Sequence, residues 1–528
     1  MARRIKINRM HQLFCKNTNQ TFNIFLLSFV TILALFLWQG HLGLSLSDEG
    51  FLWYGVQRVM QGEVPLRDFM SYDPGRYYWS AAIMSLWGVK GIVALRATVA
   101  VFQVIGLFIG LGLLLRNNVK PSLTWILLVV STLLIWMFPS HKLFDISLSI
   151  ILVGVFSFVI ERPTVHRYFL AGLVVGLVAF FGKNHGIYGV LSSLGIISYL
   201  HVHRESNIGL ISNFISWIIG VIIGYLPMLV LFAVAPGFAT AFWKSILFVL
   251  ELKTVVLPLP VPWPWLIGFE KVSAVEGVRG VFVGLFFIAI VIYSILGIVW
   301  AVRQRIKNNY ISPVFVASAI TSLSYVHCAY ARADVPHLAQ GIFPFLIGVY
   351  TVLDSQHGKV KWFGAALLCS ASLLVMLPRL SGWQCYLVQQ CIEVDVAGDK
   401  LNIDKKTAND LALLNKLAEQ FAPNGRSFIA APFLPGAYAA LERKSPIWEI
   451  YPLTPRSEAF QLAEVEKIKI ANPGFAIISD VKFDGREGLY FHNTHSIIEK
   501  YIRDNFEPLS DFTQNSAYQI YINKMILQ

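Results

Sequence analysis

The sequence predicts a polytopic α-helical membrane protein with a small soluble α/β domain at its C-terminal end. The chain has 528 residues, of which 55% are hydrophobic and only 14% are charged, and its mean hydropathy is +0.59. Soluble domains are less apolar and carry roughly 25% charged residues. Apolar runs of near-membrane length recur up to residue 378, whereas hydropathy falls and charges accumulate from residue 379 onward.

The apolar runs predict about eleven membrane spans. A span needs roughly 17 to 25 apolar residues, and several of these runs are near the short limit. The predicted spans lie at about 22–40, 95–115, 122–139, 145–160, 168–182, 187–201, 211–234, 279–302, 311–329, 338–353 and 362–378.

Basic residues predict the orientation of these spans. The first 17 residues are basic and carry no evident cleavage site, so residues 22–40 are expected to form a signal anchor with a cytoplasmic N-terminus. Each inside link then carries Lys or Arg, as the positive-inside rule requires. The inside links are 116–120, 161–167, 201–204, 303–307 and 356–361.

This threading predicts a multi-pass membrane protein with a cytoplasmic N-terminus, and its expected location is the plasma membrane, which would be the inner membrane of a bacterium. Residues 1–378 form the predicted transmembrane domain, with outward-facing loops at 41–94 and 235–278, and residues 379–528 form an extracytoplasmic domain. The first part carries 27 Lys and Arg against 13 Asp and Glu. These bases are scattered over short loops, which favours contact with anionic membrane lipids and argues against nucleic acid as a partner.

The C-terminal domain reads as a small α/β unit. Residues 427–431 and 475–479 resemble buried strands, 409–420 and 496–505 resemble amphipathic helices, and 518–522 alternates like a further strand. Cys385 and Cys391 open this domain and would be able to pair in an oxidising compartment. The five cysteines give no metal-binding pattern.

Two long outside segments have different characters. In 48–96, residues 50–61 and 76–87 have the spacing of helices that lie in the membrane interface, separated by Gly and Pro turn signals. The segment 236–276 contains closely spaced Trp and Pro at 261–265, which predicts an irregular surface loop or lid.

Asp48 and Glu49 directly follow the first predicted span. Acids that sink toward the centre of a bilayer cost roughly 2 to 3 kcal/mol each. Two adjacent acids at the mouth of a span therefore indicate a water-filled site at the membrane surface, although a solvated loop is the alternative for either acid alone.

Further charges gather at the outer ends of predicted spans. Arg332, Asp334 and His337 lie within six residues of one another, and an arginine there offers a planar fork for phosphate oxygens. A local Arg–Asp ion pair is the alternative. Lys183 lies in a predicted hairpin at 181–186 as a point charge for phosphate, or as a lysine that snorkels to the interface.

Sequence motifs exclude several classes of enzyme. The chain contains no GxxxxGK[ST], no GxGxxG after a strand, no HExxH and no CxxC. Their absence argues against an ATP-driven pump and against a nucleotide-sugar enzyme with a Rossmann core.

The arrangement of the first loop resembles the GT-C superfamily of integral-membrane glycosyltransferases. The bacterial branch known as glycosyltransferase family 39, related to lipid A aminoarabinose transferase and protein O-mannosyltransferase, is the most similar. The likeness rests on Asp48-Glu49-Gly50, Gly62-x-x-Pro65-x-x-Asp68-Phe69, Asp73-Pro74-Gly75-x-x-Tyr78-Trp79, Gly88, Arg96, Arg332-Ala-Asp334-x-x-His337 and Pro432-x-x-Pro435-Gly-Ala-Tyr438. Asp73-Pro74-Gly75 departs from the Lys-Pro-Pro-like turn of the aminoarabinose branch, so the substrate stays open.

The resemblance implies an inverting transfer from a polyprenyl-phosphate-linked sugar to an acceptor hydroxyl on a glycan, lipid or protein. Such a reaction needs a base for the acceptor proton and cations for the departing phosphate, and carboxylates are ordinarily ionised at pH 7. The candidate residues are Asp48 as base, with Glu49 as its helper or substitute, and Arg58, Lys183 and Arg332 for the donor phosphate. The candidates for substrate contacts are Tyr72 and Arg76 on the acceptor side, and Asp334 and His337, which would either orient Arg332 or contact the sugar.

No cofactor is required by the sequence, and a divalent cation between Asp48, Glu49 and Asp334 is left open. The rival class is a secondary transporter or a flippase for lipid-linked sugars. Transporters tend to contain internal repeats with charges near the bilayer midplane. This chain has no convincing repeat, and its charges gather at one surface. A non-catalytic scaffold with a sensor domain is a third option.

Overall fold

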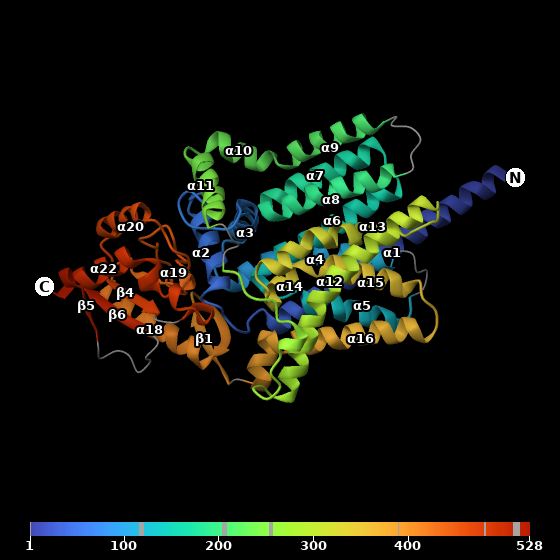
Figure 1. Ribbon diagram of the computed structural model, residues 1–528. Coiled ribbons are helices and arrows are strands. Elements are labelled where there is room, and N and C mark those ends of the chain that lie inside the picture. Colours follow the sequence, from blue (N-terminus) through green and yellow to red (C-terminus); the bar gives the residue numbers. More distant parts are fainter. Residues whose placement is uncertain are drawn as a thin grey trace. The chain divides into compact units, whose positions relative to one another are not determined.

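The structure is a computed structural model of the full chain (Figure 1). It describes residues 2–115, 121–202, 209–252, 257–388, 390–479, 482–509 and 518–527. The predicted inside link 116–120 and residues 203–204 of the link 201–204 lie outside the described residues. The chain forms two compact units. Unit 1 comprises Met1–Trp38, Val99–Val230 and Pro258–Leu380, and unit 2 comprises Gln39–Thr98, Leu231–Leu257 and Ser381–Gln528.

Unit 1 consists of helices that match the predicted apolar runs. They are α1 (Ala2–Gln39), α4 (Ile92–Leu115), α5 (Leu123–Trp136), η1 (Ser140–Lys142), α6 (Leu143–Glu161), α7 (Val165–Phe181), α8 (Lys183–His201), α9 (Leu210–Gly224), α10 (Leu226–Val234), η2 (Pro264–Leu266), α12 (Ala274–Ile306), α13 (Pro313–Ala331), α14 (Val335–Gly341), α15 (Phe343–Asp354), α16 (Lys359–Met376) and η3 (Leu377–Arg379). The first residues of α4 and the last of α10 belong to unit 2.

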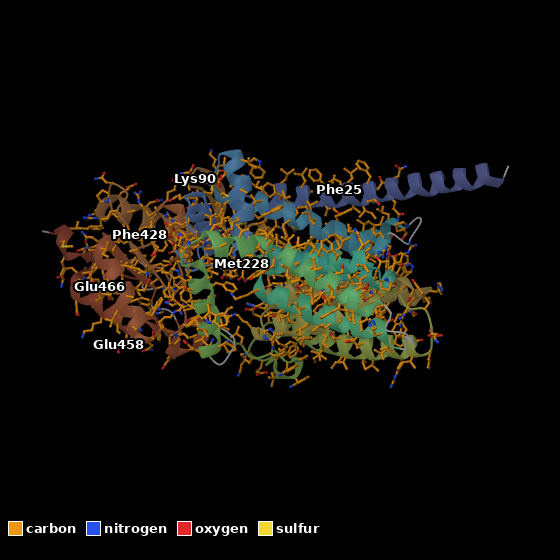
Figure 2. The ribbon with its side chains drawn as sticks, turned by 90° about the horizontal axis from the view of Figure 1, so that it is seen from above. Phe25, Lys90, Met228, Phe428, Glu458 and Glu466 are labelled. Carbon is orange, nitrogen blue, oxygen red and sulfur yellow. A yellow bond between two sulfur atoms is a disulfide. The ribbon has the colours of Figure 1, made fainter. Side chains whose placement is uncertain are left out.

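The protein is a multi-pass membrane protein, and each predicted span coincides with a helix or a bent pair of helices. Among the described residues, six helices are long and apolar enough to cross a bilayer, or eight if the bent pairs α9–α10 and α14–α15 each form one span. The helices α5 and α7 are shorter. The count of eleven spans therefore stays a prediction. Phe25 on α1, labelled in Figure 2, is one of many exposed apolar side chains on this helix, which suits a lipid-facing span.

Glycines let α7 and α9 approach closely. A Cβ atom on Gly172 would lie 2.0 Å from the carbonyl oxygen of Trp217, and one on Gly224 would lie 2.0 Å from that of Leu173. Gly176 and Gly220 meet the opposite backbone in the same way. Spacings of four residues between small side chains on both helices are the pattern by which membrane helices pack without a hydrophobic driving force.

Unit 2 combines the first long loop with the C-terminal domain. Its helices are α2 (Asp48–Met60), α3 (Pro74–Trp87), α11 (Phe238–Glu251), α17 (Ser381–Trp383), η4 (Gln384–Val388), α18 (Lys405–Phe421), α19 (Pro435–Ala440), α20 (Glu458–Ala471), η5 (Phe483–Gly485), η6 (Glu487–Leu489), α21 (Phe491–Thr494), α22 (Ser496–Asn505) and α23 (Lys524–Leu527). The helices predicted at 50–61 and 76–87 are confirmed as α2 and α3, and ten of the 13 residues of α2 are buried.

The C-terminal domain is built on two sheets, as the predicted α/β class requires. The antiparallel hairpin joins β1 (Cys391–Val396) to β2 (Asp399–Asp404). The larger sheet has the order β3-β4-β6-β5, with β3 (Ile429–Ala431) parallel to β4 (Phe475–Ser479) and antiparallel pairing of β4 with β6 (Tyr518–Asn523) and of β6 with β5 (Phe506–Pro508) (Figure 1). The predicted strands and helices of this domain are confirmed, whereas α20, β5 and the β1–β2 hairpin were not predicted.

Aromatic stacking fills the space behind the larger sheet. The ring of Phe428, labelled in Figure 2, stacks on Phe475 and on Tyr438, with a centroid distance of 4.9 Å in each case. All three side chains are fully buried. Such stacks hold α19 against β3 and β4, because aromatic pairs contribute beyond the area that they bury.

Two local predictions need correction. The segment predicted as an irregular loop at 236–276 contains the 14-residue helix α11. Its apolar residues recur at helical spacing, and that pattern outweighs the Pro-rich stretch that follows. The hairpin predicted at 181–186 has a shorter turn than expected, because α7 and α8 are separated by the single residue Gly182 and α8 begins at Lys183. The two helices pack against each other, with Gly186 beside Ala179.

Candidate active site

Asp48 lies in the first turn of α2 and is partly exposed. The turn before it is held by serine hydroxyls. The Oγ atoms of Ser45 and Ser47 are 3.0 Å apart, and the Asp48 backbone N–H donates to Ser45 Oγ at 3.2 Å. A carboxylate in the first turn also complements the positive end of the helix dipole. A partly exposed acid on a fixed backbone is suited to accept a proton from a substrate.

Tyr451 of the C-terminal domain donates its hydroxyl to Asp48 Oδ1 at 3.4 Å. Burial raises the pKa of the Tyr451 hydroxyl well above its ordinary value, and the charge of the nearby Asp48 carboxylate adds to the shift. The hydroxyl therefore keeps its proton and remains a donor. The sequence gives no local signal for this contact, since the two residues are 403 positions apart.

Glu49 forms a buried, bidentate ion pair with Arg96. Arg96 Nε donates to Glu49 Oε1 at 2.8 Å, and Nη2 donates to Oε2 at 2.7 Å. The same guanidinium also donates to the carbonyl oxygens of Gly40 and Gly43, at 2.8 Å and 2.7 Å. Both carboxylate oxygens of Glu49 are thus engaged, which favours a positioning role for Glu49 over the predicted role as helper base.

Arg58 is engaged in a second bidentate pair, with Glu63. The two hydrogen bonds measure 2.9 Å and 2.6 Å, and Lys444 of the C-terminal domain donates to the same carboxylate at 2.6 Å. Burial alone would raise the pKa of Glu63, but the hydrogen bonds from Arg58 and Lys444 outweigh it and hold the pKa below its usual value. These contacts tie the end of α2 to the C-terminal domain and give no support to the predicted phosphate contact of Arg58.

Tyr72 and Arg76 lie close to Phe51, which also contacts Tyr451. The Arg76 guanidinium sits over the Tyr72 ring, 4.7 Å from its centroid. The Tyr72 ring meets Phe51 edge-on at 4.9 Å, and Phe51 meets Tyr451 at 5.8 Å. The predicted acceptor residues and the partner of Asp48 therefore belong to one row of aromatic side chains within unit 2.

The other predicted site residues belong to unit 1. Arg332 Nε donates to Asp334 Oδ2 at 2.8 Å. Asp334 caps α14, because its Oδ1 atom accepts the His337 backbone N–H at 2.9 Å, and His337 Nδ1 lies 2.7 Å from Oδ1. Burial alone would raise the pKa of Asp334, but the hydrogen bonds from His337 and Arg332 outweigh it and hold the pKa below its ordinary value. The local Arg–Asp pair, one of the two alternatives for this segment, is present. Lys183 is partly exposed at the first position of α8.

Solved structures with a similar fold exist over nearly the whole chain. Neither a protein-family model nor a curated protein sequence matches it. The structure of ArnT, the lipid A aminoarabinose transferase, from Cupriavidus metallidurans in the apo state aligns with a TM-score of 0.53 at 11% identity, over 96% of this chain and 98% of that one. The same protein bound to undecaprenyl phosphate aligns with a TM-score of 0.51 at 12% identity, over 94% and 97%.

The chain has the GT-C fold. This confirms the fold expected from the resemblance of the first loop. At these identities the likeness extends to the fold alone, so the roles of individual residues rest on the contacts of this chain.

Within the GT-C fold of this chain, sequence reasoning missed a buried polar cluster in unit 1. His185 Nε2 lies 3.0 Å from Asp145 Oδ1, and His185 Nδ1 lies 2.8 Å from Tyr325 Oη. Beside them, Tyr188 Oη lies 2.8 Å from His327 Nδ1. A signal was available, since Asp145 is an acid at the start of a long apolar run and such residues are rare in spans.

A metal site receives no support from the residues that the structure describes. Among them, no three His, Cys, Asp or Glu side chains lie close enough to hold a metal ion. Asp48 and Glu49 belong to unit 2, whereas Asp334 belongs to unit 1. The predicted option of a cation among these three acids therefore stays a prediction.

Proposed function

We propose that this protein is a membrane glycosyltransferase. It moves a sugar from a polyprenyl-phosphate-linked donor to an acceptor hydroxyl at the extracytoplasmic face, with inversion at the anomeric carbon. The observation that carries the proposal is the state of Asp48. It is partly exposed and hydrogen-bonded to one neutral hydroxyl, whereas the adjacent Glu49 is buried in an ion pair.

Asp48 acts as the general base in a single displacement. Its carboxylate takes the proton of the acceptor hydroxyl, and the acceptor oxygen forms a bond to the anomeric carbon. The bond between that carbon and the phosphate oxygen breaks, and the polyprenyl phosphate leaves with the electron pair. A positioned base of this kind contributes roughly 10²- to 10⁴-fold to a rate.

Lys183 and Arg332 bind the phosphate of the donor. Lys183 opens α8, and the N-terminus of a helix favours anions. Arg332 presents a guanidinium whose direction is fixed by Asp334, which in turn is held by His337. Asp334 and His337 accordingly act by orienting Arg332. Two fixed cations would stabilise the negative charge that develops on the leaving phosphate.

A groove in unit 1 offers space for the apolar tail of the donor. Its volume is about 810 Å³, and it runs between α8, α12 and α13 with mostly apolar walls. Asn184, next to Lys183, lines one part of the groove, and Tyr188 and His327 line it further along. A long isoprenoid chain suits such a surface because its transfer from water into an apolar environment is favourable.

The acceptor side is assigned to Tyr72 and Arg76. An aromatic ring under a guanidinium provides both an apolar face and hydrogen-bond donors, which would suit a glycan, a lipid headgroup or a protein hydroxyl.

The disulfide between Cys385 and Cys391, with a Cα–Cα distance of 5.1 Å, favours an oxidising compartment for the C-terminal domain. The disulfide is consistent with transfer outside the cytoplasm.

The test compares Asp48→Asn with Asp410→Asn, a control on α18 whose carboxylate accepts a hydrogen bond from Tyr518. Cells that produce each variant are analysed by mass spectrometry of envelope glycans and lipid-linked sugars. We expect a glycan modification that depends on the wild-type protein, persists with Asp410→Asn and is lost with Asp48→Asn at equal expression. Normal modification by Asp48→Asn would remove the proposed base and favour transport.

A further inference from the structure

Tyr451 is the one side chain of the C-terminal domain that is hydrogen-bonded to Asp48 among the residues that the structure describes. Its hydroxyl donates to Asp48 Oδ1 at 3.4 Å, and the Ser47 hydroxyl also interacts with it. Its ring is held between Phe51 at 5.8 Å and Phe433 at 6.3 Å. The ring is therefore fixed on two sides, while the hydroxyl reaches the proposed base.

The segment that carries Tyr451 is bonded to the first loop at several points. The Ser445 backbone N–H donates to Tyr54 Oη at 3.0 Å. Trp448 Nε1 donates to the carbonyl oxygen of Leu66 at 3.1 Å, and the Met70 backbone N–H donates to the carbonyl oxygen of Trp448 at 2.8 Å. These bonds join the 445–451 segment to Tyr54 within α2 and to Leu66 and Met70 in the segment that follows α2. They fix the position and orientation of the 445–451 segment relative to α2.

We propose that Tyr451 is a positioning residue for the general base. By donating to Oδ1, it fixes the rotation of the Asp48 carboxylate and leaves Oδ2 to accept the proton of the acceptor hydroxyl. The C-terminal domain thus completes the catalytic machinery of the first loop. This inference rests on the proposed function, since it assigns a task to a neighbour of Asp48.

Two properties of Tyr451 suit this task. Burial and the Asp48 charge raise the pKa of the hydroxyl well above its ordinary value, so the hydroxyl does not compete with Asp48 for the role of base. A tyrosine also has few rotatable bonds, so little conformational entropy is lost when it holds a partner. A base held within a narrow range of angles transfers protons more efficiently than one free to rotate.

The experiment compares Tyr451→Phe with Tyr518→Phe in the full-length protein in lipid nanodiscs. The first change removes the hydroxyl and keeps the ring between Phe51 and Phe433. The second removes a hydroxyl that donates to another carboxylate of the same domain, Asp410, at 3.0 Å. Lipid-linked sugars extracted from the producing membranes serve as donor, and envelope glycans, lipids and proteins of the same cells supply the acceptor hydroxyl. The measured product is released polyprenyl phosphate.

We expect Tyr451→Phe to lower the maximal rate about tenfold. The concentration of lipid extract that gives half the maximal rate, and the affinity for undecaprenyl phosphate, should be unchanged. Tyr518→Phe should retain the wild-type rate. An unchanged maximal rate for Tyr451→Phe, a loss confined to half-saturation, or an equal loss in Tyr518→Phe would overturn the inference.

Asp48→Asn separates this inference from the proposed function. If Asp48→Asn is inactive and Tyr451→Phe is fully active, only the inference fails. If Asp48→Asn turns over normally, the proposed base fails and the inference fails with it. The thermal unfolding of each variant is recorded in parallel. A loss of rate in Tyr451→Phe supports the inference when Tyr451→Phe and Tyr518→Phe have the same unfolding temperature.

Discussion

Asp145 is an ionisable residue in the first turn of an apolar helix, and its environment explains how it is tolerated there. Its carboxylate lies 3.0 Å from His185 Nε2, and the other ring nitrogen of His185 lies 2.8 Å from Tyr325 Oη. All three side chains are buried. Ionisable groups within spans are retained only where a partner compensates for the lost hydration. Asp145, His185 and Tyr325 thus form one chain of hydrogen bonds across α6, α8 and α13.

Asp145→Leu should therefore destabilise the protein more than Asp145→Asn. The asparagine keeps a carbonyl oxygen that accepts a hydrogen bond from His185, whereas the leucine leaves the buried ring nitrogen without that partner, at a cost of about 1–3 kcal/mol. The two variants are compared by thermal unfolding in one detergent. Equal unfolding temperatures would show that the Asp145–His185 contact contributes nothing to stability.

At the scale of elements, the packing of α2 on α19 depends on two glycines. A Cβ atom on Gly50 would lie 2.4 Å from Gly436 Cα, and one on Gly436 would lie 2.8 Å from the carbonyl oxygen of Leu46. The Gly436 backbone N–H donates to that same oxygen at 2.7 Å. Only residues without a side chain permit this approach, which brings the helix of the base against the C-terminal domain.

Gly50→Ala should separate α2 from α19. The added methyl group meets backbone atoms that are not free to rotate away, and overpacking of this kind costs about 1–3 kcal/mol. We expect a lower unfolding temperature and weaker sugar transfer, because Asp48 precedes Gly50 by less than one turn. Gly488→Ala is the matched control, since a Cβ atom there would meet nothing within 4 Å. Similar unfolding temperatures for the two variants would contradict the close contact.

At the scale of the whole molecule, the sequence predicted the helices that burial in lipid requires. It did not predict the features that depend on contacts between distant parts of the chain. The apolar runs locate the helices because a bilayer requires long apolar segments whose backbone bonds are internal. Strands such as β4 were readable because all five residues are buried and the first four are apolar. The β1–β2 hairpin was not, since its two-residue turn uses Ala397 and Gly398 in place of a stronger Asn-Gly signal.

The candidate site divides in the same way. Asp48 was recognised from its place after the first span, which is a local property of the sequence. The roles of Glu49 and Arg58 depend on partners that lie far along the chain. Arg96 pairs with Glu49, and Lys444 pairs with Glu63, the carboxylate that binds Arg58. Such long-range pairs follow no periodic pattern in the sequence. The sequence therefore predicted roles for Glu49 and Arg58 in the reaction itself, whereas their contacts in the structure favour positioning roles.

The orientation of the C-terminal domain is the last expectation open to test. A phosphatase reporter that is active only outside the cytoplasm, fused after Gln528, should be active in whole cells. Cys385 and Cys391 should react with a membrane-impermeant maleimide only after treatment with an impermeant reductant, because they form a disulfide. The Cys385→Ser/Cys391→Ser double variant controls for Cys328 and Cys369, which are buried. An inactive reporter, together with labelling that requires permeabilised cells, would place the domain in the cytoplasm. The proposed acceptor would then have to be cytoplasmic as well.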